Sequence, residues 1–112
     1  MRVKRVYSPY TLTATELLGA EIALARRERR LSAKELAERL GVNRDTLAKV
    51  ERGDPSVGLG VAFEAAALVG VPLFEADPGT LSANLVQARQ RLALLPARVR
   101  SRRTSGDVND DF

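Results

Sequence analysis

The stretch SAKELAERLGVNRDTLAKVERG, residues 32–53, decides the fold of this 112-residue chain. Ser32 and Glu35 stand three residues apart, which is the capping-box pattern of a helix start, because each side chain can bond the backbone amide of the other. Gly41 can adopt the left-handed conformation that ends a helix. The first part of the stretch therefore predicts a short helix.

A second short helix is expected directly after the turn at Gly41. Asn43 is a favourable N-cap residue, and Gly53 supplies a second left-handed stop. Between them, Leu47 and Val50 lie three residues apart, so they share one face of this helix. Two short helices joined by a glycine-centred turn match the helix-turn-helix plan.

A longer helix is expected before this pair. Thr13 and Glu16 repeat the capping-box pattern, and Leu18 and Ile22 follow at helical spacing. These residues predict a helix over about 14–29.

Weaker patterns follow the pair. Ser56 is a candidate cap for a fourth helix that ends near Val69, before Gly70. Segment 71–77 suits a short strand and a loop equally, and both alternatives stay open. Apolar residues then recur at alternating spacings of four and three before Pro96, which predicts a helix with a narrow apolar seam. The seam consists of Leu81, Leu85, Ala88, Leu92 and Leu95.

These patterns divide the chain into four parts. We expect an N-terminal arm over 1–12, a helix-turn-helix domain over 13–77, a C-terminal helix over 78–96 and a flexible tail over 97–112. The expected fold is all-α, a bundle of four to five helices, with the possible short strand near 71–76 pairing across a dimer.

Composition argues against most enzyme classes. The chain has no Cys and no His, which removes disulfides, the usual zinc ligands, a Cys nucleophile and the commonest general base. We therefore expect no catalytic residue, no metal site and no cofactor. Neither a signal-peptide pattern nor a membrane-spanning apolar run is visible, so a cytoplasmic protein without membrane contact is expected.

The net charge of +4 is unevenly distributed. Residues 81–106 carry six arginines and no acid, whereas residues 107–112 carry three aspartates and no base. The arginines from Arg98 to Arg103 either add nonspecific phosphate contacts or belong to a solubilising linker. The end of the chain, with Asp110, Asp111 and Phe112, is a candidate recognition peptide for a partner protein.

The helix-turn-helix plan suits DNA for a physical reason. The major groove admits one α-helix, and the N-terminal end of a helix presents free backbone amides to phosphate. One such unit reads only a few base pairs, so these proteins usually bind as twofold dimers to half-sites about 34–36 Å apart.

Short motifs within residues 17–72 carry a family resemblance. They are Leu18-Gly19-Ala20-Glu21-Ile22, Ala25-Arg26, Leu31-Ser32, Glu35-Leu36-Ala37, Leu40-Gly41-Val42, Leu47 and Val50-Glu51-Arg52-Gly53. Together they resemble the Xre, or Cro/C1-type, family of phage-repressor-like proteins, which implies a lambda-repressor-like bundle. Segments 51–57, 71–74 and 107–112 are similar to HipB-like antitoxins, the partners of HipA-like kinases.

The resemblance implies which residues read DNA bases. They are Arg44, Asp45, Thr46, Ala48 and Lys49. Arginine and lysine can donate to guanine, aspartate can accept from cytosine, and the methyl groups of threonine and alanine can meet a thymine methyl. For Asp45 the alternative is that its charge complements the helix dipole.

Phosphate contacts are implied for Ser32, Asn43, Arg39 and Arg52. The family commonly has Gln directly after the serine that starts the first helix of the pair. This chain has Ala33 there, so that DNA contact is not carried over.

The resemblance also implies two structural contacts. Arg26 and Glu51 correspond to an ion pair between helices of the family. Leu73 and Phe74 fall where the HipB-like branch pairs a strand across its twofold axis, which makes them the first candidates for a dimer interface. The leucine seam over 81–95 is the second candidate.

The expected function is repression without catalysis. A homodimer would bind an inverted-repeat operator and regulate the operon of a HipA-like kinase toxin, which makes DNA, a second copy and that kinase the expected partners. Such a protein would lie with the nucleoid. One alternative is a stand-alone regulator of the same family without a toxin. Another is a protein-interaction module that has lost DNA binding, which Ala33 and Asp45 favour.

Overall fold

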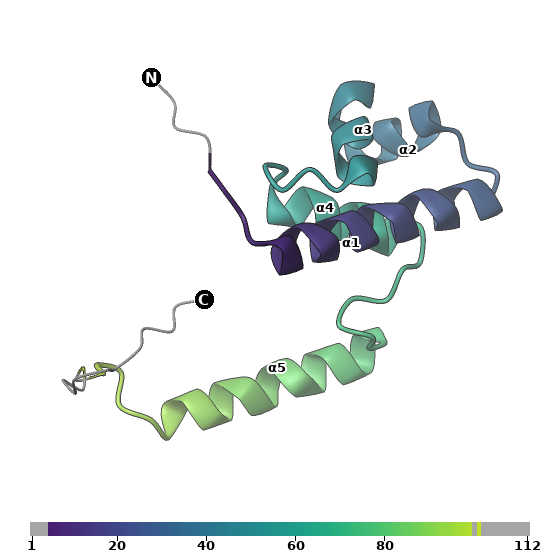
Figure 1. The fold of residues 1–112 in the computed structure, drawn as a ribbon. Coiled ribbons are helices and arrows are strands. Elements are labelled where there is room, and N and C mark those ends of the chain that lie inside the picture. The colour runs from purple at the N-terminus through teal and green to yellow at the C-terminus, as the bar shows by residue number, and fades with distance from the viewer. Residues whose placement is uncertain (1–4, 100, 102–112) are drawn as a thin grey trace. The chain divides into compact units, whose positions relative to one another are not determined.

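The computed structural model describes residues 5–99 and 101, and in these residues it contains five α-helices and no strand (Figure 1). The helices are α1 (Pro9–Glu28), α2 (Ala33–Leu40), α3 (Arg44–Arg52), α4 (Leu59–Leu68) and α5 (Pro78–Ala93). The expected all-α fold is confirmed. The chain forms two compact units, one ending at Asp77 and the other beginning at Pro78, so α1 to α4 belong to the first. None of the described helices is long and apolar enough to cross a membrane.

The first helix begins earlier than the sequence predicted. Ser8 is its N-cap, and the Thr11 amide donates to the Ser8 hydroxyl oxygen at 3.3 Å. Pro9 fills the first helical turn, where its fixed φ suits a helix and its missing N–H costs nothing. The predicted start at Thr13 was wrong, since this residue lies inside α1. The chain expected as an arm over 1–12 is therefore helical from Pro9.

The central pair begins and ends as predicted. The Glu35 amide donates to the Ser32 hydroxyl at 3.0 Å, and the Ser32 amide donates to the Glu35 carboxylate at 2.8 Å. Asn43 caps α3. Gly41 and Gly53 have φ values of 77° and 76°, in the left-handed region. The helix-turn-helix pair thus follows from local signals alone.

The predicted cap of α4 was wrong. The amide and the hydroxyl of Ser56 both donate to the Asp54 carboxylate, at 2.9 and 2.7 Å. This side chain therefore closes the loop after α3. The N-cap of α4 is Gly58, which makes no side-chain cap bond.

Segment 71–77 is a tight turn, which decides between the two alternatives in favour of a loop. The Ala76 amide donates to the Leu73 carbonyl at 3.2 Å, and these two residues form an isolated antiparallel bridge. Phe74 and Glu75 between them have φ values of 57° and 52°. Both central residues are left-handed, as in a type I′ turn, so the chain doubles back within four residues.

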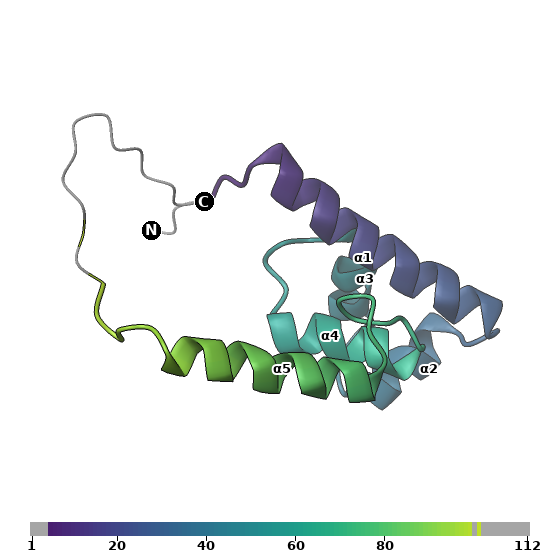
Figure 2. The ribbon, with the colours of Figure 1, turned by 90° about the horizontal axis from the view of Figure 1, so that it is seen from below.

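The core of the first unit is shared by its four helices. α1 packs on α3 and α4, and α2 packs on the same two helices (Figures 1 and 2). The buried apolar cluster consists of Ile22, Leu36, Ala37, Leu47, Val50, Ala65, Ala66 and Val69. The outer faces of α2 and α3 are thereby left for polar residues.

Two glycines let α1 and α3 approach closely. A Cβ at Gly19 would lie 2.5 Å from the carbonyl oxygen of Val50, and one at Gly53 would overlap the backbone of Glu16. Both positions lie too close to a neighbouring backbone for any side chain. The direction in which α3 leaves the core is fixed by this contact.

The second unit contains α5, whose apolar seam is not covered. No residue of α5 is buried. Leu85 and Leu92 are exposed, and Leu81 is half-buried. The helix ends at Ala93, so Leu95, which the seam was expected to include, lies beyond the last turn.

Candidate nucleic-acid interface

The outward surface of α3 carries the side chains expected to read bases. Arg44, Asp45 and Ala48 are exposed, and Thr46 and Lys49 are half-buried. The opposite face of α3 holds the buried residues of the core. The first two turns of α3 therefore present two cations, one carboxylate and two methyl groups to solvent.

The caps of α2 and α3 keep donors available for phosphate. The Thr46 amide donates to Oδ1 of Asn43 at 2.7 Å, which leaves the Asn43 Nδ2 amide group as the donor. The Ser32 hydroxyl accepts from the Glu35 amide, and its hydrogen interacts with the Glu35 carboxylate, from which it can rotate toward a phosphate oxygen. Both side chains are exposed. Asn43 can therefore cap its helix and bind a phosphate oxygen at once, whereas Ser32 can do so once its hydroxyl hydrogen turns away from Glu35.

The capping box also sets the charge at the start of α2. The Ser32 amide, and then its hydroxyl, bond the Glu35 carboxylate and lower the pKa of this group below its ordinary value. Glu35 therefore stays ionised at neutral pH beside the N-terminus of α2. This negative charge complements the helix dipole.

A shallow recess of about 490 Å³ separates the starts of α2 and α3. Ala33 lines it from α2, while Arg44, Asp45 and Ala48 line it from α3. The short side chain of Ala33 leaves the recess open where a glutamine would extend. The structure thus brings Ala33 together with three of the expected base-reading residues.

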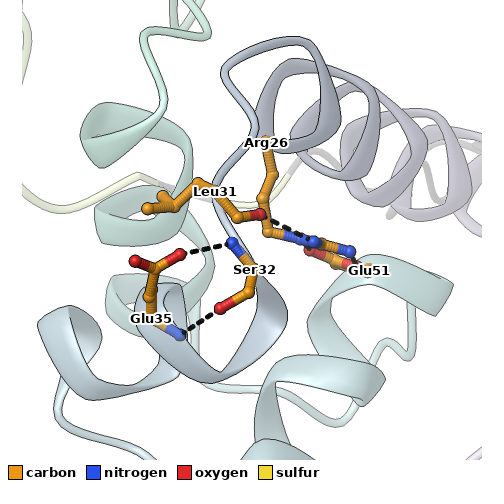
Figure 3. A network of polar contacts seen from close by, with 5 residues as sticks. All are labelled: Arg26, Leu31, Ser32, Glu35 and Glu51. Carbon is orange, nitrogen blue, oxygen red and sulfur yellow. Dashed lines mark hydrogen bonds and ion pairs between the residues drawn. The ribbon is translucent and has the colours of Figure 1, made fainter.

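An ion pair holds α3 in place behind this surface. Arg26 Nε donates to Glu51 Oε2 at 2.6 Å, and Nη2 donates to Oε1 at 3.1 Å (Figure 3). Arg26 Nη1 also donates to the carbonyl of Leu31 at 2.9 Å. The hydrogen bond to Glu51 raises the pKa of Arg26 above its already high value. The expected helix-to-helix pair is confirmed, and it joins α1, α3 and the chain leading into α2.

The two expected arginine contacts differ in their surroundings. Arg39 lies in the last turn of α2 and is exposed. Arg52 lies in the last turn of α3, with Nη2 at 3.9 Å from Oδ2 of Asp54. This pair is weak because its atoms are far apart and the Arg52 side chain is exposed, so the Arg52 charge remains available to a phosphate.

The residues expected at a dimer interface point in different directions. Leu73 is half-buried against the core cluster, whereas Phe74 is 76% exposed. The rings of Phe63 and Phe74 meet edge to face, with centroids 6.1 Å apart. The turn thus holds one aromatic ring outward. Asp110, Asp111 and Phe112, expected to bind a partner, lie outside the described residues.

A second apolar stripe on α1 escaped the sequence analysis. Leu17 and Leu24 are more than half exposed, on a different face from buried Ile22. Their spacing of seven residues was the available signal, because positions i and i+7 share a helix face. It was hidden by the stronger stripe that forms the core.

Comparison with known protein families identifies a match in the first unit. Residues 22–75 match a protein-family model described as Helix-turn-helix. The matched range runs from the middle of α1 through α2, α3 and α4 to the turn that contains Phe74. No curated protein and no solved structure matches the chain.

Proposed function

From the DNA-binding helix-turn-helix domain of the Xre (Cro/C1) type that this chain carries, we propose that the protein acts as a homodimeric repressor. Domains of this type are found in transcriptional regulators. One observation carries the proposal. The first turns of α3 present Arg44 and Asp45 to solvent, while the Arg26–Glu51 pair fixes the helix from behind. A rigid helix with exposed polar side chains is what readout of the major groove requires.

Base reading falls to the exposed face of α3. The guanidinium of Arg44 and the ammonium of Lys49 can each donate to O6 and N7 of a guanine, for about 1–3 kcal/mol of discrimination per contact. The methyl groups of Thr46 and Ala48 suit a thymine methyl. Asp45 accepts from a cytosine amine, which offsets the cost of a carboxylate near phosphates.

Phosphate contacts position the domain without reading sequence. The Ser32 hydroxyl and the Asn43 Nδ2 group donate at the two helix starts, and Arg39 and Arg52 add positive charge. Binding through these groups releases counterions, so affinity falls as salt rises.

Dimerisation supplies the second half-site. The turn with Leu73 and Phe74 supports an interface there, because an aromatic ring held outward by its neighbour Phe63 is a suitable anchor. A twofold dimer reads an inverted repeat, and occupation of that repeat blocks transcription by occlusion.

The resemblance to HipB-like antitoxins supports a second partner. In this proposal the acidic end of the chain, with Asp110, Asp111 and Phe112, binds a HipA-like kinase toxin, and the complex regulates its own operon. Deletion of residues 97–112 should weaken binding to a kinase encoded in the same operon and leave DNA binding intact. Kinase affinity unchanged by the deletion contradicts this role of the tail.

Two alternatives keep the fold and change the role. A stand-alone regulator of the same family would bind its operator and copurify with no kinase. An interaction module would bind no operator, and the short Ala33 and the carboxylate of Asp45 in the recess favour it.

Selection from random duplex DNA tests the proposal. The full-length protein at near-physiological salt should enrich an inverted repeat with half-sites one helical turn apart. If the protein binds DNA without enriching any sequence, and this binding disappears as salt rises, the interaction is charge attraction alone. This result would favour the interaction module.

A further inference from the structure

We infer that the groove along the outer face of α1 receives helix α5 of a second copy of this chain. The inference rests on the proposed homodimer and names the contact that holds it together. The groove lies entirely within the first unit and has a volume of about 790 Å³.

The floor of this groove is apolar and open to solvent. Its main apolar side chains are Leu17, Leu24, Phe63, Pro72, Leu73 and Phe74. Leu17 and Leu24 are 57% and 58% exposed, and Phe74 is 76% exposed. A contiguous patch of large exposed apolar side chains marks an interaction site, because the removal of such side chains from water is favourable.

The rim of the groove is acidic. Three charged residues line it, and all are glutamates: Glu21, Glu28 and Glu75. One cation, the guanidinium of Arg29, lies against the lining residue Gly70, so the glutamates outnumber it. Two copies of this face cannot pair with each other without bringing glutamate against glutamate, which is unfavourable. The occupant should therefore be apolar on one face and basic beside it.

Helix α5 has these properties. Its seam of Leu81, Leu85, Ala88 and Leu92 has no buried member, and its only charged residues are Arg89 and Arg91. The helix carries no acidic residue, so every charge on it is opposite to the rim of the groove. Apolar and electrostatic complementarity thus point to the same occupant.

The lengths of the two surfaces also agree. At about 1.5 Å per residue, the stripe of α1 from Ala14 to Glu28 rises about 21 Å. The seam from Leu81 to Leu92 rises about 16 Å on the same scale. The seam therefore fits along the stripe without passing its ends.

Exchange between two copies covers both surfaces in one assembly. If each copy places its α5 in the groove of the other, the twofold symmetry produces two identical contacts. A pair formed by two α5 helices alone would leave Leu17, Leu24 and Phe74 in water. An α5 helix in the groove of its own chain would cover both surfaces without joining two copies, whereas the reciprocal contact covers both and also supplies the proposed homodimer.

Charge reversal tests the contact in the full chain by sedimentation equilibrium. Glu21→Arg with Glu28→Arg should weaken dimerisation at least about tenfold, because like charges then face each other. Arg89→Glu with Arg91→Glu should do the same. All four substitutions together should restore dimerisation, since the charges are again opposite.

A matched control separates this effect from net charge. Glu38→Arg with Glu64→Arg changes the charge by the same amount at exposed positions that do not line the groove. The control variant should dimerise as the wild type does. Equal weakening in the control, or no rescue by the fourfold variant, overturns the inference.

Thiol cross-linking identifies the copy that supplies the helix, and the absence of native cysteine leaves no background. A Leu17→Cys or Leu24→Cys chain is mixed with a Leu85→Cys chain of different mass and treated with a short bifunctional maleimide. Leu85 lies near the middle of the seam, so it should reach one of the two groove positions in either helix direction. The expected product joins the two chains.

Other products overturn the inference in distinguishable ways. Leu85→Cys chains joined only to one another indicate pairing of two α5 helices. A chain that carries both Leu24→Cys and Leu85→Cys is treated in the same way, and a cross-linked monomer of it without cross-linked dimer indicates that α5 fills the groove of its own chain. If operator binding and dimerisation persist with either product, the proposed repressor stands and only the α5 contact fails. A monomer that enriches no DNA contradicts both.

Discussion

Arg26 on α1 and Glu51 on α3 form a two-point ion pair, with Nε–Oε2 and Nη2–Oε1 distances of 2.6 and 3.1 Å. The side chains are only 11% and 14% exposed. The same arginine bonds the Leu31 carbonyl, immediately before α2 begins. One guanidinium therefore fixes both helices of the DNA-binding pair relative to α1.

Removing one partner of this pair should destabilise the fold. Arg26→Ala should lower the free energy of unfolding by about 3 kcal/mol, because it leaves the Glu51 carboxylate nearly buried and unpaired. Arg26→Lys should lose less, since the charge remains while the two-point geometry is lost. Chemical denaturation measures both. Arg27→Ala is the control, because Arg27 is exposed. If Arg27→Ala lowered the free energy of unfolding as much as Arg26→Ala does, the ion pair would have no special role in stability.

The contact between α1 and α3 should not tolerate a methyl group. Gly19→Ala should cost about 2–3 kcal/mol of unfolding free energy, because its Cβ would lie 2.5 Å from the Val50 carbonyl oxygen. Gly60→Ala is the matched control within α4, where a Cβ meets nothing within 4 Å. The control should stabilise the protein by about 0.5–1 kcal/mol. If Gly19→Ala also stabilises the protein, α1 and α3 do not approach each other as closely as the structure indicates.

The capping box predicts a pH dependence of known sign. The pKa of Glu35 is lowered in the fold from its ordinary value of 4.5, chiefly by the Ser32 amide and hydroxyl. Its contribution to stability is therefore full above this value and is lost as the pH falls through the lower, folded pKa. Glu35→Gln should be less stable than wild type at pH 7, with the difference shrinking as the pH falls below 4.5. A difference that grows on acidification would contradict the hydrogen bonding seen.

The exposed ring of Phe74 should matter for association rather than for folding. Phe74→Asp should give monomers in sedimentation and lose operator affinity, because a charge replaces the apolar anchor. Leu59→Asp is a suitable control, since Leu59 is exposed and does not line the groove. A dimeric Phe74→Asp protein would move the interface elsewhere.

The parts of the fold set by short-range signals were predictable. Ser32 and Glu35 bond each other's amides, and Gly41 follows with positive φ, so all the determinants lie within ten residues. The start of α1 was not predicted because two start signals compete. Thr13 fits a capping box, yet Ser8 followed by Pro9 provides a cap and a favourable first helical residue upstream, and the structure uses this earlier start.

The turn before α5 could not be read from its residues. Phe74 and Glu75 both adopt positive φ, which usually needs Gly or Asn, and neither residue signals such a turn. The contact of Phe74 with Phe63 on α4 accompanies this conformation, and it depends on tertiary structure. For the same reason, the groove formed with Leu24 was not predicted, whereas the exposed face of α3 was.

Repeating the DNA selection with Arg44→Ala tests most directly whether α3 reads bases. The wild-type protein should enrich an inverted repeat, and the variant should enrich the same repeat with its preference relaxed at one base pair in each half-site. The discrimination lost there should be about 1–3 kcal/mol. A variant that binds all sequences more weakly by one common factor would make Arg44 a phosphate contact and contradict the account.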